Sequence, residues 1–322
     1  MRPAPTPFRR VHRLAEAAAF LGLLATLGGF LGRYAWFLEI FSHFRVQIAC
    51  CFVFYAALEW AARRHRLAAA SLALAAVNAA PALLLFLPAS ASATPQPTAP
   101  AARLRILQAN ILTCNTNVPA LFDLVAREAP DVVVLQEPDT WWLRQLAPLT
   151  NSYPVFATLP RDDNFGAAIF CKTNARSAEV FHLSDPECAP CSLARIAVGG
   201  KTVTVVGTHT LAPYDEAMWR GRNRYTLELA GRLRAIKGPL VVSGDFNNTP
   251  WSSNLRDFLA ASGLRDSSQG RGPLPTWPVS ALAPARIPLD HCFHSAEVRV
   301  LDRRPGPDIG SDHLPLIIDI AF

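Results

Sequence analysis

Two stretches decide how this chain of 322 residues is interpreted: Val242-Ser243-Gly244-Asp245-Phe246-Asn247 and Gly310-Ser311-Asp312-His313-Leu314-Pro315-Leu316. Each stretch places acidic, amide or imidazole groups directly beside an apolar, strand-like run. Such groups can bind a metal ion and accept a proton. Together the two stretches predict a metal-dependent phosphoester hydrolase built at the edge of a sheet.

Four further apolar runs end in the same way, at Asn110, Glu137, His209 and Asp290. One acid after a strand is common, but six polar strand ends in one chain are not a chance pattern. Strand ends in a sandwich of sheets converge on one edge, so groups far apart in sequence can meet there. The sequence therefore predicts one site that all six ends share.

The pattern from residue 103 onward is rich in strands. Strands are expected at Leu104–Ala109, Val132–Gln136, Tyr153–Ala157, Ala167–Cys171, Ala194–Val198, Thr202–Thr208, Leu240–Ser243, Leu289–Phe293, Val298–Leu301 and Leu314–Ile320. Helices are expected at Pro119–Glu128, Asp215–Ala235 and Ser253–Ser262, the last with Ser252 or Ser253 as N-cap. Many strands with few helices between them predict sheets packed face to face with helices outside.

The net charge of +6 is confined to the N-terminal third of the chain. Residues 1–100 hold nine Lys/Arg and three Asp/Glu, which accounts for the whole surplus. Residues 101–322 hold 22 residues of each sign and are neutral overall. The basic residues are therefore better explained by membrane topology than by nucleic-acid binding.

Three apolar segments are expected to form a bundle of transmembrane helices, at about residues 14–32, 46–62 and 67–88. Leu67–Pro88 has no charged residue, and at about 1.5 Å per residue its length can cross a hydrocarbon core of about 30 Å. The first two segments carry Glu16, Gln47 or Glu59 near their ends. For these two, an interfacial helix or a tight hairpin remains an alternative.

Basic residues at the N-terminus and at Arg63–Arg66 predict that both lie in the cytoplasm. Three crossings then place residues after 88 outside, so the protein is expected to be a multi-pass protein of the inner or plasma membrane with a periplasmic or extracytoplasmic domain. Residues 89–102, rich in Pro, Ala and Ser, are expected to be a linker. Ala89–Ala93 also resembles a processing site, which leaves late cleavage open.

Cys188-Ala189-Pro190-Cys191 forms a CxxC pair in a proline-containing loop. Outside the cytosol a disulfide is the favoured interpretation. Free thiols, or a metal or redox role, remain alternatives. The other cysteines of residues 103–322 are expected to be core residues.

The order Asn, Gln-Glu, Thr-His, Gly-Asp-Phe-Asn, Leu-Asp-His, Ser-Asp-His-Leu-Pro resembles the endonuclease/exonuclease/phosphatase superfamily over about residues 103–322. The resemblance implies a four-layer α/β sandwich, two packed mixed sheets with outer helices, and a divalent-metal site. A membrane-anchored, exported subgroup of bacterial type looks similar to the whole chain. The sequence thus divides into a membrane region (1–88), a linker (89–102) and a catalytic domain (103–322).

Chemistry and the resemblance together suggest metal ligands. Glu137 is expected to be the main carboxylate for Mg²⁺ or Mn²⁺, which are hard cations that prefer oxygen ligands. Asn110 and Asp312 are expected to bind the ion directly or through water. Asp245 would hold a second metal or orient the attacking water.

The catalytic groups are expected to be His313 as general base and Asp290 as the carboxylate that orients it. Asn247 would donate a hydrogen bond to the phosphate, and His209 would bind the phosphate or stabilise the transition state. Two further residues are candidates for substrate contact: Asn164 before a strand and Arg220 on the long helix.

Each of these residues also has a purely structural explanation. Asn110 could be a turn residue, Glu137 a solvated loop acid and His209 a core histidine. Asp245 and Asn247 could form only an Asx turn, Asp290 could pair with a structural arginine, and Arg220 could belong to a solvated helix face.

The favoured function is hydrolysis of phosphodiester bonds, nuclease-like, outside the cytoplasm. A phospholipid or other phosphomonoester or diester hydrolase of the sphingomyelinase or phosphatase type is the alternative, and a non-catalytic binding module is a further one. The expected partners are a phosphate-ester substrate, either nucleic acid or a lipid headgroup, and the lipid bilayer; no protein partner can be inferred.

Overall fold

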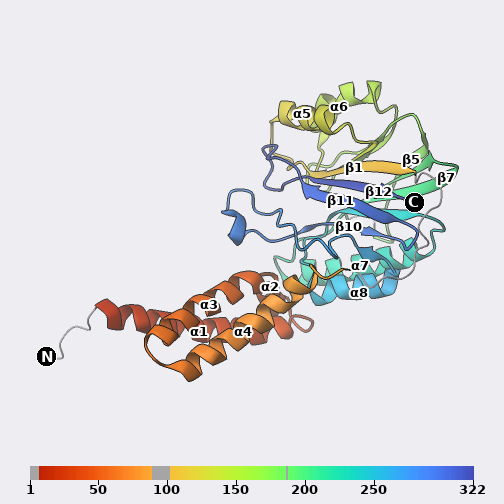
Figure 1. Cartoon of the computed structure of the whole chain (residues 1–322). Coiled ribbons are helices and arrows are strands. Elements are labelled where there is room, and N and C mark those ends of the chain that lie inside the picture. Colours follow the sequence, from red (N-terminus) through yellow and green to blue (C-terminus); the bar gives the residue numbers. More distant parts are fainter. Residues whose placement is uncertain (1–6, 89–101, 186–187) are drawn as a thin grey trace.

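The computed structural model of the chain describes residues 7–88, 102–185 and 188–322, and for residues 7–10 only the backbone. A bundle of helices at the N-terminus leads into a sandwich of two sheets (Figure 1). Of the expected linker, residues 89–101 lie outside the described residues.

The bundle contains four helices: α1 (Pro7–Phe30), α2 (Trp36–His43), α3 (Arg45–Ala61) and α4 (His65–Leu84). Two helical stretches, Val11–Phe30 and His65–Leu84, are long and apolar enough to cross a membrane. Helices α2 and α3 pass the same test only as a pair, bent by 63° at Phe44. Length and composition thus allow two spans, or three if the bent pair is one span.

This arrangement corrects two expected boundaries. The segment around 46–62 is preceded by an additional helix, α2, which was not among the three expected helices. The last apolar helix ends at Leu84 and not at Pro88.

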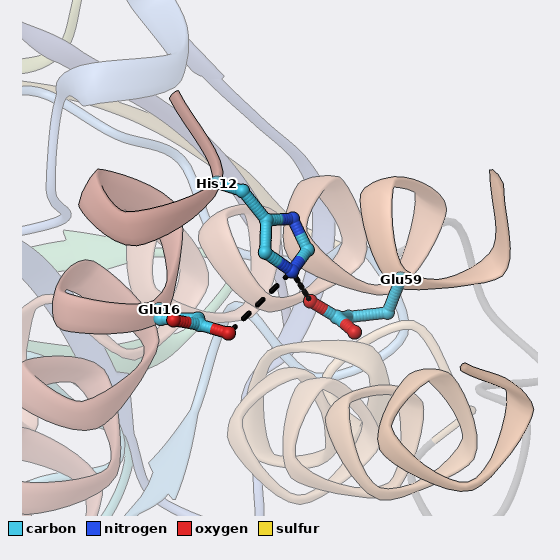
Figure 2. Close-up of side chains that lie close together, drawn as sticks. All are labelled: His12, Glu16 and Glu59. Carbon is cyan, nitrogen blue, oxygen red and sulfur yellow. Dashed lines mark ion pairs between the residues drawn. The ribbon is translucent and has the colours of Figure 1, made fainter. Parts of the chain in front are cut away.

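Charged side chains in the apolar bundle are neutralised by one another. Glu59 is fully buried near the end of α3, and its Oε1 lies 3.1 Å from Nε2 of His12 on α1. Glu16 Oε1 lies 3.5 Å from the same nitrogen (Figure 2). Arg64 Nη1 is 3.0 Å from Glu16 Oε1, so the group is an ion-pair network that already contains a cation. Glu59 and Arg64 lie where α3 ends and α4 begins, and this turn is at the end of the bundle away from the sandwich (Figure 1).

The sandwich consists of two six-stranded sheets. The first has the order β11 (Arg299–Pro305), β12 (Leu316–Ala321), β1 (Arg103–Asn110), β2 (Val132–Gln136), β4 (Ala167–Cys171) and β3 (Val155–Leu159). The second has the order β5 (Ala175–Phe181), β6 (Cys191–Val198), β7 (Lys201–His209), β8 (Leu240–Asp245), β10 (Asp290–His294) and β9 (Arg265–Asp266). Parallel pairing joins β1 to β2 and β7 to β8, so both sheets are mixed.

Each sheet buries one face against the other and the opposite face under helices. Residues such as Ile106 and Val205 fill the space between the sheets. Helices α5 (Val118–Glu128) and α6 (Thr140–Leu146) cover the first sheet, while α7 (Glu216–Arg234) and α8 (Ser253–Ser262) cover the second. Successive side chains of each strand point alternately toward the other sheet and toward the helices, and this produces the expected four-layer α/β sandwich.

Some elements differ from the expectation. The partly exposed strand β5 and the short helix α6 were not expected, and neither were the 3₁₀ turns η1 (Ala147–Asn151) and η2 (Ala283–Ala285). Ser252 is the N-cap of α8, since its Oγ accepts a hydrogen bond of 3.1 Å from the backbone N–H of Leu255. The favoured disulfide is not formed: Cys191 is a buried free thiol whose Sγ lies 3.0 Å from the hydroxyl of Tyr225, and Cys188 is also free.

The sandwich packs against one end of the bundle, with α2 beside α7 (Figure 1). Glu39 of α2 forms a buried ion pair with Arg222 of α7. At the end of α4, Gln269 donates a hydrogen bond of 2.7 Å to the carbonyl of Leu87. Arg33, just after α1, forms an ion pair with Asp257 of α8. The C-terminal ends of α1 and α4 therefore both face the sandwich.

Candidate active site

The register of the second sheet brings three polar groups together. Asp245 at the end of β8 pairs with His209 on β7 and with Asp290 on β10. All three are buried, because each belongs to a strand in the interior of the sandwich. The common position of these strand ends, expected from the sequence, is thus a consequence of sheet register.

His313 and Asp290 form a hydrogen-bonded dyad. Nδ1 of His313 lies 2.8 Å from Oδ2 of Asp290, and the side-chain amide of Gln108 donates to Oδ1 of the same carboxylate at 2.9 Å. The other ring nitrogen, Nε2, lies 3.5 Å from Oδ2 of Asp245. With Nδ1 bound to a carboxylate, Nε2 is the nitrogen positioned to exchange a proton with a substrate or water.

The charges of this cluster perturb one another. Burial alone would lower the pKa of His313, but the charges of Asp290 and Asp245 outweigh it and raise that pKa to about 10. Burial opposes ionisation of Asp290, yet the neighbouring imidazolium holds its pKa below the ordinary value. The pKa of Asp245 is raised because burial dominates over the attraction of His313. Such opposed shifts are typical of functional sites.

A second group of oxygen atoms faces the dyad. The amide nitrogen of Asn110 lies 2.8 Å from Oε1 of Glu137 and 3.2 Å from Oδ2 of Asp245. Asn110 ends β1 of the first sheet and Asp245 ends β8 of the second, so the site spans both sheets. The backbone N–H of Thr113 donates to Oε2 of Glu137 at 3.2 Å.

Glu137 adopts a left-handed backbone conformation, with φ of 69°. This conformation is unfavourable for a residue with a side chain and persists where the surrounding structure determines it. It turns the Glu137 carboxylate toward Asn110 and away from the strand that precedes it. The alternative of a solvated loop acid is therefore wrong, since Glu137 is buried.

Glu137, Asp245 and His313 line a cavity of about 510 Å³. Four carboxylates lie on its wall, those of Glu137, Asp163, Asp245 and Asp312. Among the described lining residues none is Lys or Arg. The two buried carboxylates, Glu137 and Asp245, face imidazole rings and no Lys or Arg of the cavity wall. Carboxylate oxygens gathered in this way fit Mg²⁺ or Mn²⁺.

His209 and Asn247 form a further pair of polar groups beside Asp245. Nε2 of His209 is 3.5 Å from Oδ2 of Asp245 and 3.3 Å from the amide nitrogen of Asn247. The Asn247 amide also donates to the carbonyl of Thr210 at 2.8 Å, which fixes its orientation. Both residues line the cavity and present polar hydrogens or lone pairs to it.

The remaining candidates divide into two groups. Asp312 lines the cavity, and its Oδ2 accepts a hydrogen bond of 3.0 Å from the indole of Trp277. Asn164 also lines the cavity. Arg220 does not: it is exposed and pairs with Glu216 one helical turn away.

Close approach of backbones makes glycine necessary at Gly244, directly before Asp245. A Cβ atom at this position would lie 1.8 Å from the carbonyl oxygen of Thr208. Only glycine lets β8 pass β7 closely enough to place Asp245 beside His209.

Several contributors were not found from the sequence. Gln108 shares a strand face with Asn110, two residues away, and this alternation was the available signal. Helix α2 supplies Ile40, His43 and Phe44 to the cavity wall, and no local pattern indicates this.

Comparison with known proteins gives one family match. The profile described as "Endonuclease/Exonuclease/phosphatase family" matches residues 107–313. No curated protein matches the chain by sequence.

Solved structures share the fold. An endonuclease/exonuclease/phosphatase from Bacteroides vulgatus superposes with a TM-score of 0.58 at 19% identity, covering 68% of this chain and 98% of that chain. D. rerio TDP2 complexed with single strand DNA product gives a TM-score of 0.57 at 18% identity, covering 68% and 98%. Sphingomyelinase C from Streptomyces griseocarneus gives 0.51 at 19% identity, covering 69% and 99%. At these identities the likeness extends to the fold alone.

Proposed function

Because the chain belongs to the endonuclease/exonuclease/phosphatase family, we propose that it is a membrane-anchored, divalent-metal-dependent hydrolase of phosphodiester bonds. The observation that carries the proposal is that the His313–Asp290 dyad, Asp245, Asn110 and Glu137 form one connected cluster, of which His313, Asp245 and Glu137 line the cavity. One of the similar structures is a complex with a single-strand DNA product and another is a sphingomyelinase, so the fold serves both nucleic-acid and lipid phosphodiesters.

In the proposed reaction, a cation held by Asp245 and Glu137 would offset the carboxylate charges that raise the pKa of His313, which leaves the ring neutral. Nε2 of His313 then takes a proton from a water molecule as the water oxygen bonds to phosphorus. The phosphorus–oxygen ester bond then breaks, and the departing oxygen gains a proton from solvent. Asp290 fixes the ring and stabilises the imidazolium that forms. Asp245, 3.5 Å from Nε2 of His313, is placed to hold the attacking water in line.

Glu137, Asp245 and Asp312 would hold Mg²⁺ or Mn²⁺. Asn110, whose amide nitrogen faces Glu137 and Asp245, would contact the ion through water. When bound, such an ion supplies positive charge to a phosphoryl oxygen and to the leaving oxygen. His209 and Asn247 would contact the remaining phosphoryl oxygens, since both present nitrogen atoms to the cavity. Asn164 would contact the substrate, whereas Arg220 would not, because it lies outside the cavity wall.

The helical bundle would place the catalytic domain outside the cytoplasm of a cell with an inner or plasma membrane. The basic turn Arg63–Arg66 lies at the end of the bundle away from the sandwich (Figure 1). Positive residues favour the cytoplasmic side, so the sandwich lies on the other side. A phosphatase-type reporter fused after residue 102 should be active in the exported location, and a cytoplasmic readout would contradict this orientation.

Full-length protein in detergent micelles tests the activity. It should hydrolyse bis-p-nitrophenyl phosphate with Mg²⁺ and stop in EDTA. His313→Ala should lower turnover by at least about 10²-fold, the usual effect of losing a general base. His182→Ala is the matched control, because His182 does not line the cavity. A folded His313→Ala variant with unchanged turnover would remove His313 from the mechanism.

A further inference from the structure

The catalytic cavity is completed by a helix of the apolar bundle. Ile40, His43 and Phe44, at the end of α2, line the same cavity as Glu137 and His313. The catalytic groups and the N-terminal helices therefore share a wall, which a soluble sandwich alone would not provide.

This wall is held in place by the loop that follows Asp245. The indole of Trp251 donates a hydrogen bond of 2.7 Å to the carbonyl of Ser42, and Nδ1 of His43 lies 3.1 Å from Oγ1 of Thr249. Arg222, the ion-pair partner of α2, also donates to the carbonyl of Asn247 at 3.4 Å. All of these groups are buried or nearly so, which makes α2 a fixed part of the site.

The composition of the cavity wall does not suit a nucleic acid. Binding a DNA or RNA strand depends on several Lys or Arg contacts to phosphates, and none of the described lining residues is of either type. Apolar residues instead make up most of the wall besides the catalytic groups: Leu112, Phe165, Met218, Ile287 and Leu289, together with the side chains from α2.

The surroundings of the cavity suit a bilayer surface. On α2, Phe37 is 52% exposed, and the helix continues through Phe44 into the apolar helix α3. Gln47 of α3 donates hydrogen bonds to the carbonyls of Pro284 and Arg286. The same loop contains Leu282, which is 83% exposed. Exposed apolar groups beside helices that are apolar enough to cross a membrane are typical of a surface that contacts lipid.

We infer that the substrate is the phosphodiester headgroup of a membrane lipid, held with its phosphate at the catalytic groups and its apolar part against Ile40 and Phe44 of α2. This inference rests on the proposed phosphodiesterase function and names its substrate class. His43 adds a polar contact: its Nε2 is buried at the cavity and has no hydrogen-bond partner among the described residues. A glycerol or ester oxygen of the lipid would satisfy this nitrogen.

The test uses full-length protein with Mg²⁺ and three substrates. These are mixed micelles of phosphatidylglycerol, phosphatidylethanolamine and cardiolipin in dodecyl maltoside, soluble bis-p-nitrophenyl phosphate, and a single-stranded oligonucleotide. Products of lipid cleavage are followed by ³¹P NMR. Ile40→Ala and Phe44→Ala are compared with Leu227→Ala, an exposed residue of α7 that does not line the cavity.

We expect EDTA-sensitive lipid hydrolysis. Ile40→Ala and Phe44→Ala should lower kcat/KM for lipid, relative to kcat/KM for the soluble diester, by about tenfold, which corresponds to about 1.4 kcal/mol. Leu227→Ala should leave this ratio unchanged. Turnover of the soluble diester without lipid hydrolysis, an unchanged ratio in both cavity variants, or preference for the oligonucleotide would overturn the inference. Failure to hydrolyse even the soluble diester would instead overturn the proposed function.

Discussion

The ion pair between Glu39 and Arg222 joins the helical bundle to the catalytic sandwich, and substitution of either residue removes it. The exposed fractions of their side chains are 1% and 0%. Burial lowers the pKa of Arg222, while the Glu39 carboxylate opposes this effect. Arg222→Met therefore leaves a carboxylate buried between α2 and α7 without its cation.

The expected loss in free energy of unfolding is about 3–5 kcal/mol, the usual cost of removing one partner of a buried pair. Glu39→Leu should give a similar loss, because it leaves the guanidinium buried. The double variant, Glu39→Leu with Arg222→Met, removes both charges and should recover most of the wild-type stability, since apolar replacement of a buried pair is often neutral or stabilising. The pair would thus show a strong coupling in a double-mutant cycle.

The assay is urea unfolding of full-length protein at a fixed detergent concentration, followed by tryptophan fluorescence. Arg220→Met is the matched control: it breaks the exposed pair with Glu216 on the same helix and should change stability little. If Arg222→Met were no more destabilising than Arg220→Met, or if the double variant were as unstable as the single ones, the buried pair would not hold α2 in place.

Three further predictions concern the site itself. Gly244→Ala should destabilise the protein and abolish activity, because its Cβ would lie 1.8 Å from a backbone oxygen. Gly231→Ala should be tolerated, because no atom lies within 4 Å of the added Cβ. Equal thermal stability of the two variants would contradict the close approach at Gly244. Mg²⁺ should raise the melting temperature of the wild type, and Glu137→Gln should reduce this rise, as measured by calorimetry; an undiminished rise would exclude Glu137 as a ligand. In EDTA, the raised pKa of folded His313 should stabilise the protein. This stability is fully present below the ordinary pKa of 6.5 and is lost as pH rises through about 10. Asp290→Asn should flatten this pH dependence in urea titrations at a series of pH values, and an unchanged profile would refute the pairing.

Much of the site could be predicted from the sequence, because its residues lie at the ends of locally recognisable strands. Val132–Gln136 and Ala167–Cys171 were expected with the bounds observed, since continuous apolar runs between polar segments are typical of buried strands. The polar residue that ends such a run necessarily reaches the edge of its sheet. Asn110, Glu137 and Asp245 could therefore be assigned to one site before their distances were known.

Only the tertiary structure decided which groups meet across the two sheets and what closes the cavity. Arg220 and Arg222 stand two residues apart in one helix, yet one is exposed and the other is buried against Glu39, because positions two apart on a helix point in different directions. No helix was expected between residues 32 and 46, and only packing against α7 shows that Glu39 is part of a buried interface. Local sequence determines which side chains a strand or helix presents, whereas the partner that they meet depends on sheet register and domain packing, which no short stretch encodes.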